Sequence, residues 1–125
     1  MKKLTLKEAV LRFVLMLAAV LVFTFFDWLV HSSSAYLSVP GFYFRNKIMY
    51  GTVLAFLSSL VFRKLSLGKQ SLFTSLITVG VLQIRYALYG YPLYFHLIVL
   101  PEHFIVLWAS SYGALKVLGS ILKRK

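Results

Sequence analysis

The chain has 125 residues, of which 60% are hydrophobic and only 14% are charged. This balance excludes an ordinary soluble domain, which carries more charge, and the length suits a single domain over residues 1–125. The absence of cysteine excludes disulfides, thiolate metal sites and cysteine-held clusters. The net charge of +11 comes from basic residues that flank apolar runs, which favours contact with anionic lipid head groups over nucleic acid binding.

The first apolar run predicts a membrane-spanning helix over about residues 13–32. It is unbroken from residue 13 to residue 26, and Asp27 and His31 then follow near its far end. The connection at 33–44 contains serine, proline and glycine, which are typical of a turn.

A second, shorter span is predicted over about residues 47–62. Its small side chains lie three or four residues apart, which favours close approach of another helix. These residues are Gly51, Ala55, Ser58 and Ser59.

The third predicted span covers about residues 71–89 and has Arg85 near its end. The Gly-Tyr-Pro segment at 90–92 breaks the helix. The fourth span is predicted over about residues 96–116 and has the least certain start, because Pro101 either begins this helix or lies within a longer one.

The basic residues predict the orientation. Eleven of the fourteen fall on one side of the predicted spans, and both termini should therefore be cytoplasmic. The resulting expectation is an all-α, integral membrane four-helix bundle with up-down-up-down topology, N-in and C-in, in the cell (inner or plasma) membrane. The eleven residues are Lys2, Lys3, Lys7, Arg12, Arg63, Lys64, Lys69, Lys116, Lys123, Arg124 and Lys125.

Most of the remaining ionisable side chains are expected at one depth in the membrane. With a rise of about 1.5 Å per residue, Asp27 lies roughly 21 Å from the cytoplasmic start of its span, and His103 lies roughly 20 Å from Lys116. His96 and Glu102 belong to the same outer side. Ionisable groups inside apolar segments are costly, and they indicate a functional site.

One interpretation of these residues is a metal or haem site. His31, His96 and His103 would be the ligands, and Asp27 or Glu102 would complete or orient them. Imidazole and carboxylate together suit zinc, copper or non-haem iron, but the spacing matches no named motif.

The main hypothesis is an outward-facing polar site that binds an ion, a proton or a small ligand. Asp27 and His31 would titrate, Glu102 and His103 would oppose them from the fourth helix, and Arg85 would balance the charge. The competing structural interpretation is that the same groups form interhelical bonds that only lock the bundle together.

Aromatic side chains suggest a further alternative. Seven of the eight tyrosines fall on the predicted outer half, and a one-sided aromatic belt favours contact with a partner subunit or an amphipathic ligand. The chain is then a non-catalytic accessory subunit of a larger membrane complex, or a homo-oligomer. No recognisable catalytic motif is present, and the sequence leaves open whether the chain is an enzyme.

Overall fold

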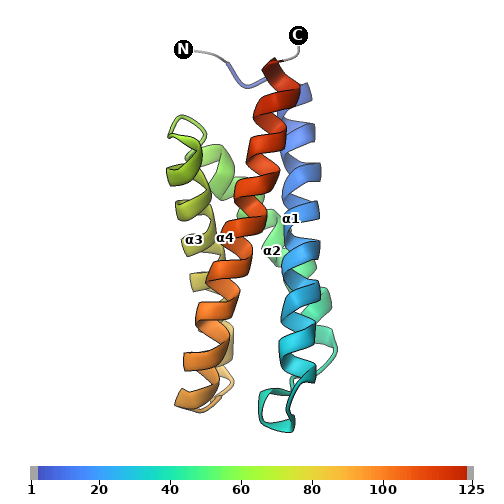
Figure 1. Cartoon of the computed structure of the whole chain (residues 1–125), viewed down its shortest axis with the longest axis vertical. Helices are drawn as coiled ribbons and strands as arrows, with labels where there is room; N and C mark the ends of the chain where they lie inside the picture. The colour runs from blue at the N-terminus through green and yellow to red at the C-terminus, as the bar shows by residue number, and fades with distance from the viewer. Residues whose placement is uncertain (1–2, 124–125) are drawn as a thin grey trace.

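The computed structural model describes residues 3–123, and four helices account for most of them (Figure 1). The helices are α1 (Leu6–Ser32), α2 (Phe42–Val61), α3 (Leu67–Leu88) and α4 (Leu93–Lys123). A short 3₁₀ helix, η1 (Ala35–Leu37), lies in the connection between α1 and α2. No strand occurs within residues 3–123, and the predicted all-α class is confirmed.

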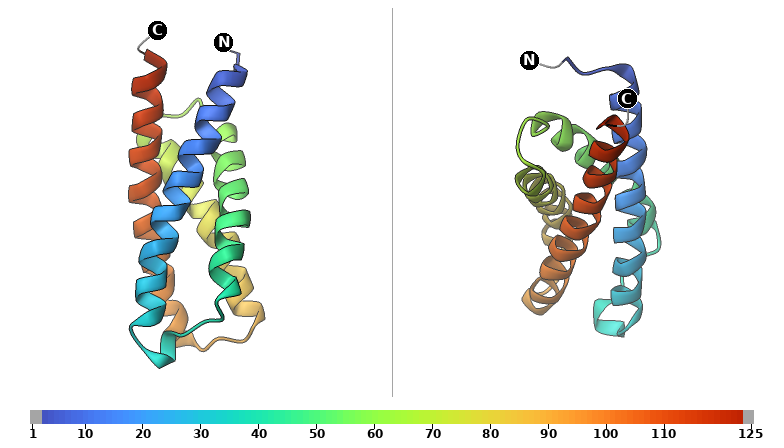
Figure 2. Two further views of the ribbon diagram at one scale, coloured as in Figure 1. Left: turned by 90° about the vertical axis from the view of Figure 1, so that its right-hand side faces the viewer. Right: turned by 45° about the horizontal axis from the view of Figure 1, so that its top comes forward.

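Successive helices run in opposite directions, so that both ends of the described chain lie at the same end of the molecule (Figures 1 and 2). The helix α1 packs against α2 and α4, and α3 packs against the same two helices. Residues far apart in the sequence, at the end of α1 and the start of α4, are thereby brought side by side.

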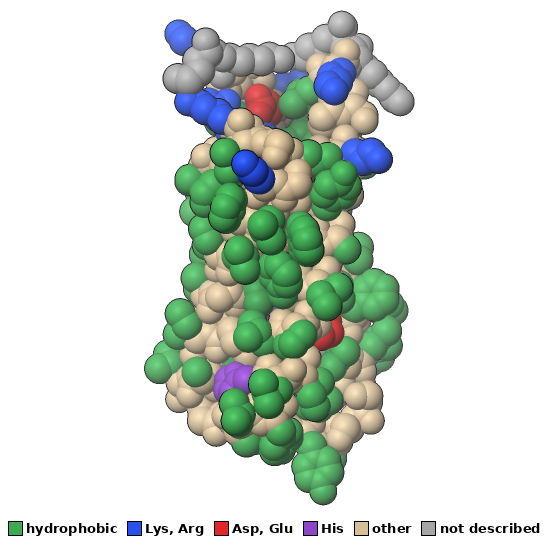
Figure 3. All heavy atoms as spheres, turned by 60° about the vertical axis from the view of Figure 1, so that its left-hand side comes forward, with side chains coloured by type: hydrophobic (Ala, Val, Ile, Leu, Met, Phe, Trp, Pro, Cys, Tyr) green, Lys and Arg blue, Asp and Glu red, His purple; other side chains and the backbone are tan. Residues whose placement is uncertain are grey.

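Three of the helices, α1, α3 and α4, are long and apolar enough to cross a membrane. The helix α2 has a similar length of 20 residues, about 30 Å, but Arg45 and Lys47 lower the apolar character of its first turns. Apolar side chains cover much of the outer surface, and basic side chains gather at the end that carries both termini (Figure 3). Lys2, Arg124 and Lys125, which entered the predicted orientation, lie outside the described residues.

The helices extend beyond the predicted spans, because a helix continues past the apolar segment that a membrane would cover. The helix α1 begins one turn after the N-terminal lysines, where the Thr5 hydroxyl accepts a hydrogen bond from the Glu8 amide at 3.1 Å. The helix α4 begins at Leu93, and Pro101 lies inside it. Between α3 and α4, Gly90 adopts a φ of 75°, a conformation that side chains rarely allow.

Small and hydroxyl side chains allow the helices to approach closely. All four residues of the predicted small-residue face of α2 are buried, and a Cβ added at Gly51 would lie 3.4 Å from a methyl group of Val20. The buried face of α3 carries Ser71, Thr74, Ser75 and Thr78, all fully buried. The hydroxyls of Ser75 and Ser111 meet at 3.1 Å between α3 and α4.

Candidate functional site

Five polar side chains from all four helices meet inside the bundle, near the end opposite the termini. Asp27 and His31 lie one turn apart on α1, Lys47 lies on α2, Tyr86 on α3 and His103 on α4; we refer to these five residues as the Asp27 cluster. All five are buried, and Asp27 and His103 have no exposed surface at all. Phe23 and Phe95, also fully buried, pack against its histidines.

The Asp27 carboxylate is the centre of the cluster. Its Oδ2 accepts a bond from the Lys47 ammonium, which forms an ion pair between α1 and α2. Its Oδ1 lies 2.5 Å from Nε2 of His103 and 3.2 Å from Nε2 of His31. One buried carboxylate therefore links three helices, and the lysine supplies the opposite charge that a buried carboxylate requires.

The position of His31 constrains where protons lie. Its Nδ1 is 2.5 Å from the backbone carbonyl oxygen of Leu37 in η1, and only a protonated Nδ1 can donate to that oxygen. Its Nε2 faces Oδ1 of Asp27, which is also an acceptor. A hydrogen bond there requires a second proton, either on the His31 ring or on Asp27. The phenolic oxygen of Tyr86 lies at 3.5 Å, at the limit of a hydrogen bond to the same Nε2.

In His103, unlike in His31, only one ring nitrogen faces polar groups of the described chain. Its Nε2 contacts Oδ1 of Asp27 and lies 3.2 Å from the Lys47 ammonium, while its buried Nδ1 has no hydrogen-bond partner within residues 3–123. An Nε2 that donates to Asp27 cannot accept from Lys47 at the same time. The proton between His103 and Asp27 thus determines whether Lys47 bonds one neighbour or two.

Glu102 borders the cluster with a second carboxyl group. Its side chain is 15% exposed, and its Oε2 lies 3.7 Å from Nε2 of His103. Neither carboxylate oxygen makes a hydrogen bond to another part of the described chain. Glu102 therefore lies within reach of the cluster without a hydrogen bond to it.

Three of the predicted metal ligands do converge. One ligand atom each from Asp27, His31 and His103 lie within 4.8 Å of one another. However, the 2.5 Å between Asp27 and His103 is shorter than the roughly 3.3 Å that separates two ligand atoms held about 2.0 Å from a tetrahedral zinc. The Lys47 ammonium already bonds this carboxylate, and it is the cation that the geometry accommodates.

His96, the remaining predicted metal ligand, lies outside this group. Its Nδ1 is 2.7 Å from the side-chain amide nitrogen of Gln83, and its Nε2 is 3.2 Å from the carbonyl oxygen of Tyr91. These contacts join the start of α4 to the end of α3 and to the turn between them. The ring therefore serves the α3–α4 connection, and both of its nitrogens are engaged there.

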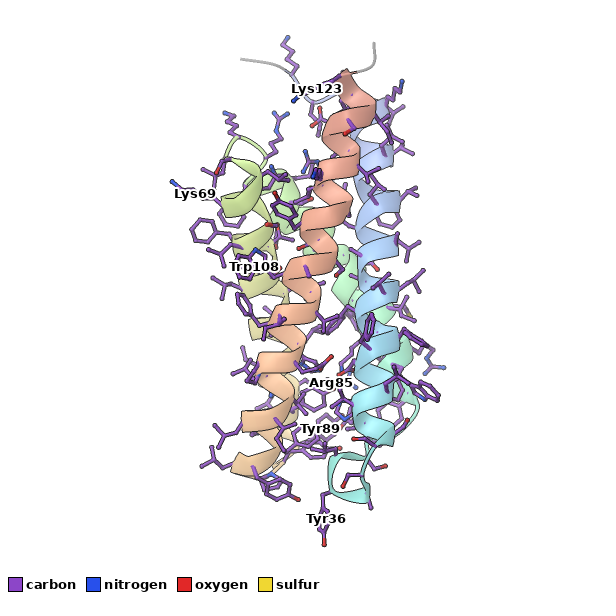
Figure 4. All side chains as sticks on the ribbon, in the orientation of Figure 1. Tyr36, Lys69, Arg85, Tyr89, Trp108 and Lys123 are labelled. Carbon is purple, nitrogen blue, oxygen red and sulfur yellow. The ribbon has the colours of Figure 1, made fainter. Side chains whose placement is uncertain are left out.

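Arg85, the predicted charge-balancing residue, also lies apart from Asp27. Its guanidinium carbon lies 5.0 Å from the centre of the Tyr43 ring, 5.7 Å from that of Tyr89 and 5.9 Å from that of Phe42. Figure 4 labels Arg85 and Tyr89, both of α3, toward the end of the bundle opposite the termini. Aromatic rings hold the arginine in place. The charge of Asp27, which the sequence analysis expected Arg85 to balance, is balanced by Lys47.

One member of the Asp27 cluster borders a cavity. A cavity of about 390 Å³ lies at the same end of the bundle, between the end of α1, the η1 connection and the start of α2. Among the five members of the Asp27 cluster, only His31 lines it, together with Trp28, Phe44 and residues of the connection. His31 therefore separates the cavity from the buried carboxylate.

Two members of the cluster were not among the predicted site residues. Lys47 lies at the predicted depth, but a lysine at the end of an apolar segment is ordinarily a topology signal. Tyr86 was assigned to the aromatic belt. The signal that could have identified Lys47 is electrostatic, because Asp27 inside a predicted span needs a cation, and Lys47 lies at a matching depth on the next helix.

No protein-family model, no curated protein and no solved structure matches this chain.

Proposed function

We propose that the protein is a small polytopic membrane protein of the binding or transport type, which takes up and releases a proton at the Asp27 cluster. The observation that carries the proposal is the contact between His31 Nε2 and Asp27 Oδ1 while Nδ1 of the same ring faces a carbonyl oxygen. This arrangement needs one proton more than a neutral histidine beside an ionised carboxylate provides.

The proposed membrane arrangement is an up-down-up-down bundle with both termini cytoplasmic. The basic end of the molecule supports this orientation through the positive-inside rule. The helix α2 would cross the membrane with the other three, because its charged Lys47 is buried against Asp27 and does not face lipid. The cavity beside His31 then opens to the external side.

In this orientation, His31 is the entry point. A proton that arrives from the cavity at His31 can pass to Oδ1 of Asp27 at 3.2 Å and on to Nε2 of His103 at 2.5 Å. Protonation of Asp27 weakens its attraction for the Lys47 ammonium, which can turn toward His103 at 3.2 Å for as long as Nε2 of that ring carries no proton. Proton uptake would thereby change the contacts between α1, α2 and α4, which is the kind of coupling that transport requires.

The test uses the full-length protein in liposomes that enclose a pH-sensitive dye. Wild type is expected to accelerate the decay of an imposed pH gradient, and Asp27→Asn is expected to abolish this acceleration. Glu8→Gln is the matched control, because it removes the same charge from the opposite end of α1. Equal rates for wild type, Asp27→Asn and protein-free liposomes, with all proteins folded and inserted, would reject proton transport and leave the cluster a structural lock.

A further inference from the structure

At the end of the bundle that carries both termini, a second polar site is built around a buried arginine. Arg12 on α1 is 4% exposed, and one of its terminal nitrogens donates to the carbonyl oxygen of Ser59 at 3.1 Å and to Oε1 of Gln70 at 2.6 Å. Its other terminal nitrogen lies 3.2 Å from Oε1 of Glu8, as the i,i+4 spacing allows. The arginine thus joins α1 to α2 and α3.

Arg12 keeps one donor without an acceptor. Its Nε is buried and makes no hydrogen bond to any side chain or backbone group within residues 3–123. Arg12 also lines a cavity of about 430 Å³ between α1, α3 and α4. A buried donor without a partner is unfavourable, and an oxygen that reached Nε from the cavity would satisfy it.

The walls of this cavity carry further groups that attract an anion. Lys116 and Lys123 contribute from α4, while the hydroxyl of Ser120, which also lines the cavity, donates to the Lys116 carbonyl oxygen at 3.2 Å. Leu67 and Gln70, in the first turn of α3, bring the positive end of that helix to the cavity, and its N-cap residue Ser66 makes no side-chain capping bond. Glu8 offsets one positive charge but is already bonded to Arg12.

Leucines line the rest of the cavity. Leu115, Leu118 and Leu122 come from α4, as the two lysines do, so that a charged group in the cavity would have hydrocarbon next to it. A site that combines a guanidinium, two ammonium groups and a helix N-terminus with leucine side chains suits an anion attached to an apolar chain.

We propose that this cavity binds a phosphate group, as carried by an anionic lipid of the adjoining leaflet or by a free phosphate-type anion. Arg12 Nε would donate to a phosphate oxygen, Lys116 and Lys123 would neutralise its charge, and the start of α3 would contribute its amide dipoles. The proposal is independent of the Asp27 cluster, which lies near the other end of the helices.

The experiment measures binding of phosphatidylglycerol to the full-length protein by native mass spectrometry, with phosphatidylcholine as the neutral comparison. Wild type is expected to retain phosphatidylglycerol preferentially. Lys116→Gln and Lys123→Gln are each expected to weaken it about fivefold. Lys69→Gln is the matched control, because Lys69 is exposed at the same end but projects from α3 away from the cavity (Figure 4), and it should change little.

A second variant tests the cavity without changing charge. Gly119 lines the cavity, and a Cβ added there meets no atom within 4 Å, so that Gly119→Leu fills the space while the helix is preserved. This variant should lose the preference for phosphatidylglycerol and keep its thermal stability in neutral detergent.

Inorganic phosphate separates the two sources of the ligand. Stabilisation of wild type by phosphate, absent in Gly119→Leu, supports the site with a free anion as its ligand. Preference for phosphatidylglycerol without an effect of phosphate supports the site with a lipid as its ligand. The proposal is overturned if Gly119→Leu binds like wild type, if Lys69→Gln weakens binding as much as the cavity lysines do, or if neither ligand binds.

Discussion

Lys47 and Asp27 form a fully buried ion pair between α2 and α1, and this pair makes the polar centre of the bundle compatible with its apolar surroundings. A carboxylate alone at this position would be strongly unfavourable, and so would an ammonium alone. The pair also explains why α2 tolerates a lysine six residues into a helix that packs between α1 and α3.

The first prediction follows from this pair. Asp27→Asn and Lys47→Met should each destabilise the folded protein by about 3–5 kcal/mol, because each leaves one buried charge without its partner. The double variant should lose less than the sum of the two, since no unpaired charge remains. Unfolding in detergent mixtures measures the three free energies, and strict additivity would mean that the two charges do not interact.

His31 should carry a proton on each ring nitrogen. Its Nδ1 faces the Leu37 carbonyl oxygen and its Nε2 faces Asp27, so that both nitrogens meet acceptors. Nitrogen-15 NMR of the histidine rings distinguishes this state from a neutral tautomer. The control is Asp27→Asn, in which the need for the second proton disappears and a neutral ring is expected. A neutral His31 in wild type would mean that the extra proton lies on Asp27.

Lys47 should also control metal binding. In wild type its ammonium contacts the carboxylate that a metal would need, while the ligand atoms of Asp27, His31 and His103 already converge. We expect Lys47→Met to bind Zn²⁺ at least about tenfold more tightly than wild type, because the competing positive charge is gone. Isothermal titration calorimetry measures the affinity.

The control for that titration is the double variant Lys47→Met with His103→Ala, which removes one of the three ligands and should bind no better than wild type. Tight zinc binding by wild type itself would show that the lysine moves aside, and it would favour the metal site over the proton site.

The sequence was sufficient to predict the class of the molecule and part of the site, for identifiable reasons. Long apolar runs with basic flanks predict helices directly, and Asp27, His31 and His103 are brought together as their depths implied. Depth alone does not specify which face of a helix a residue occupies. His96 shares the level of His31 but bonds Gln83 and the Tyr91 carbonyl oxygen, and no spacing in the chain indicates this.

The residue that balances the charge of Asp27 was not identified from the sequence, for a related reason. Lys47 lies near the start of α2 and Arg85 near the end of α3, so that both are close to the end of the bundle opposite the termini and depth does not distinguish them. The aromatic rings surround Arg85 only once α2 and α3 have packed together.

Arg85→Gln should therefore leave proton flux unchanged and cost about 0.5–2 kcal/mol of stability through lost cation–π contacts. Flux assays and unfolding of the same preparation measure both, and a loss of flux would return Arg85 to the site.

The last prediction concerns the buried hydroxyls between the two ends of the bundle. Those of Thr74 and Thr78 on α3 are fully buried and have no hydrogen-bond partner within the described chain. Where no water reaches these hydroxyls, Thr78→Val keeps the shape of the side chain and removes an unsatisfied polar group, and it raises stability by up to about 1–3 kcal/mol.

Ser75→Ala is the contrast. The Ser75 hydroxyl bonds the Ser71 carbonyl oxygen at 2.7 Å and Ser111 at 3.1 Å, and its loss should cost about 0.6 kcal/mol. Equilibrium unfolding in mixed micelles compares the two. Destabilisation by Thr78→Val would instead mean that the threonine holds an internal water, because only a satisfied hydroxyl is costly to remove, and such a water on α3 would extend a proton path from the Asp27 cluster toward Arg12.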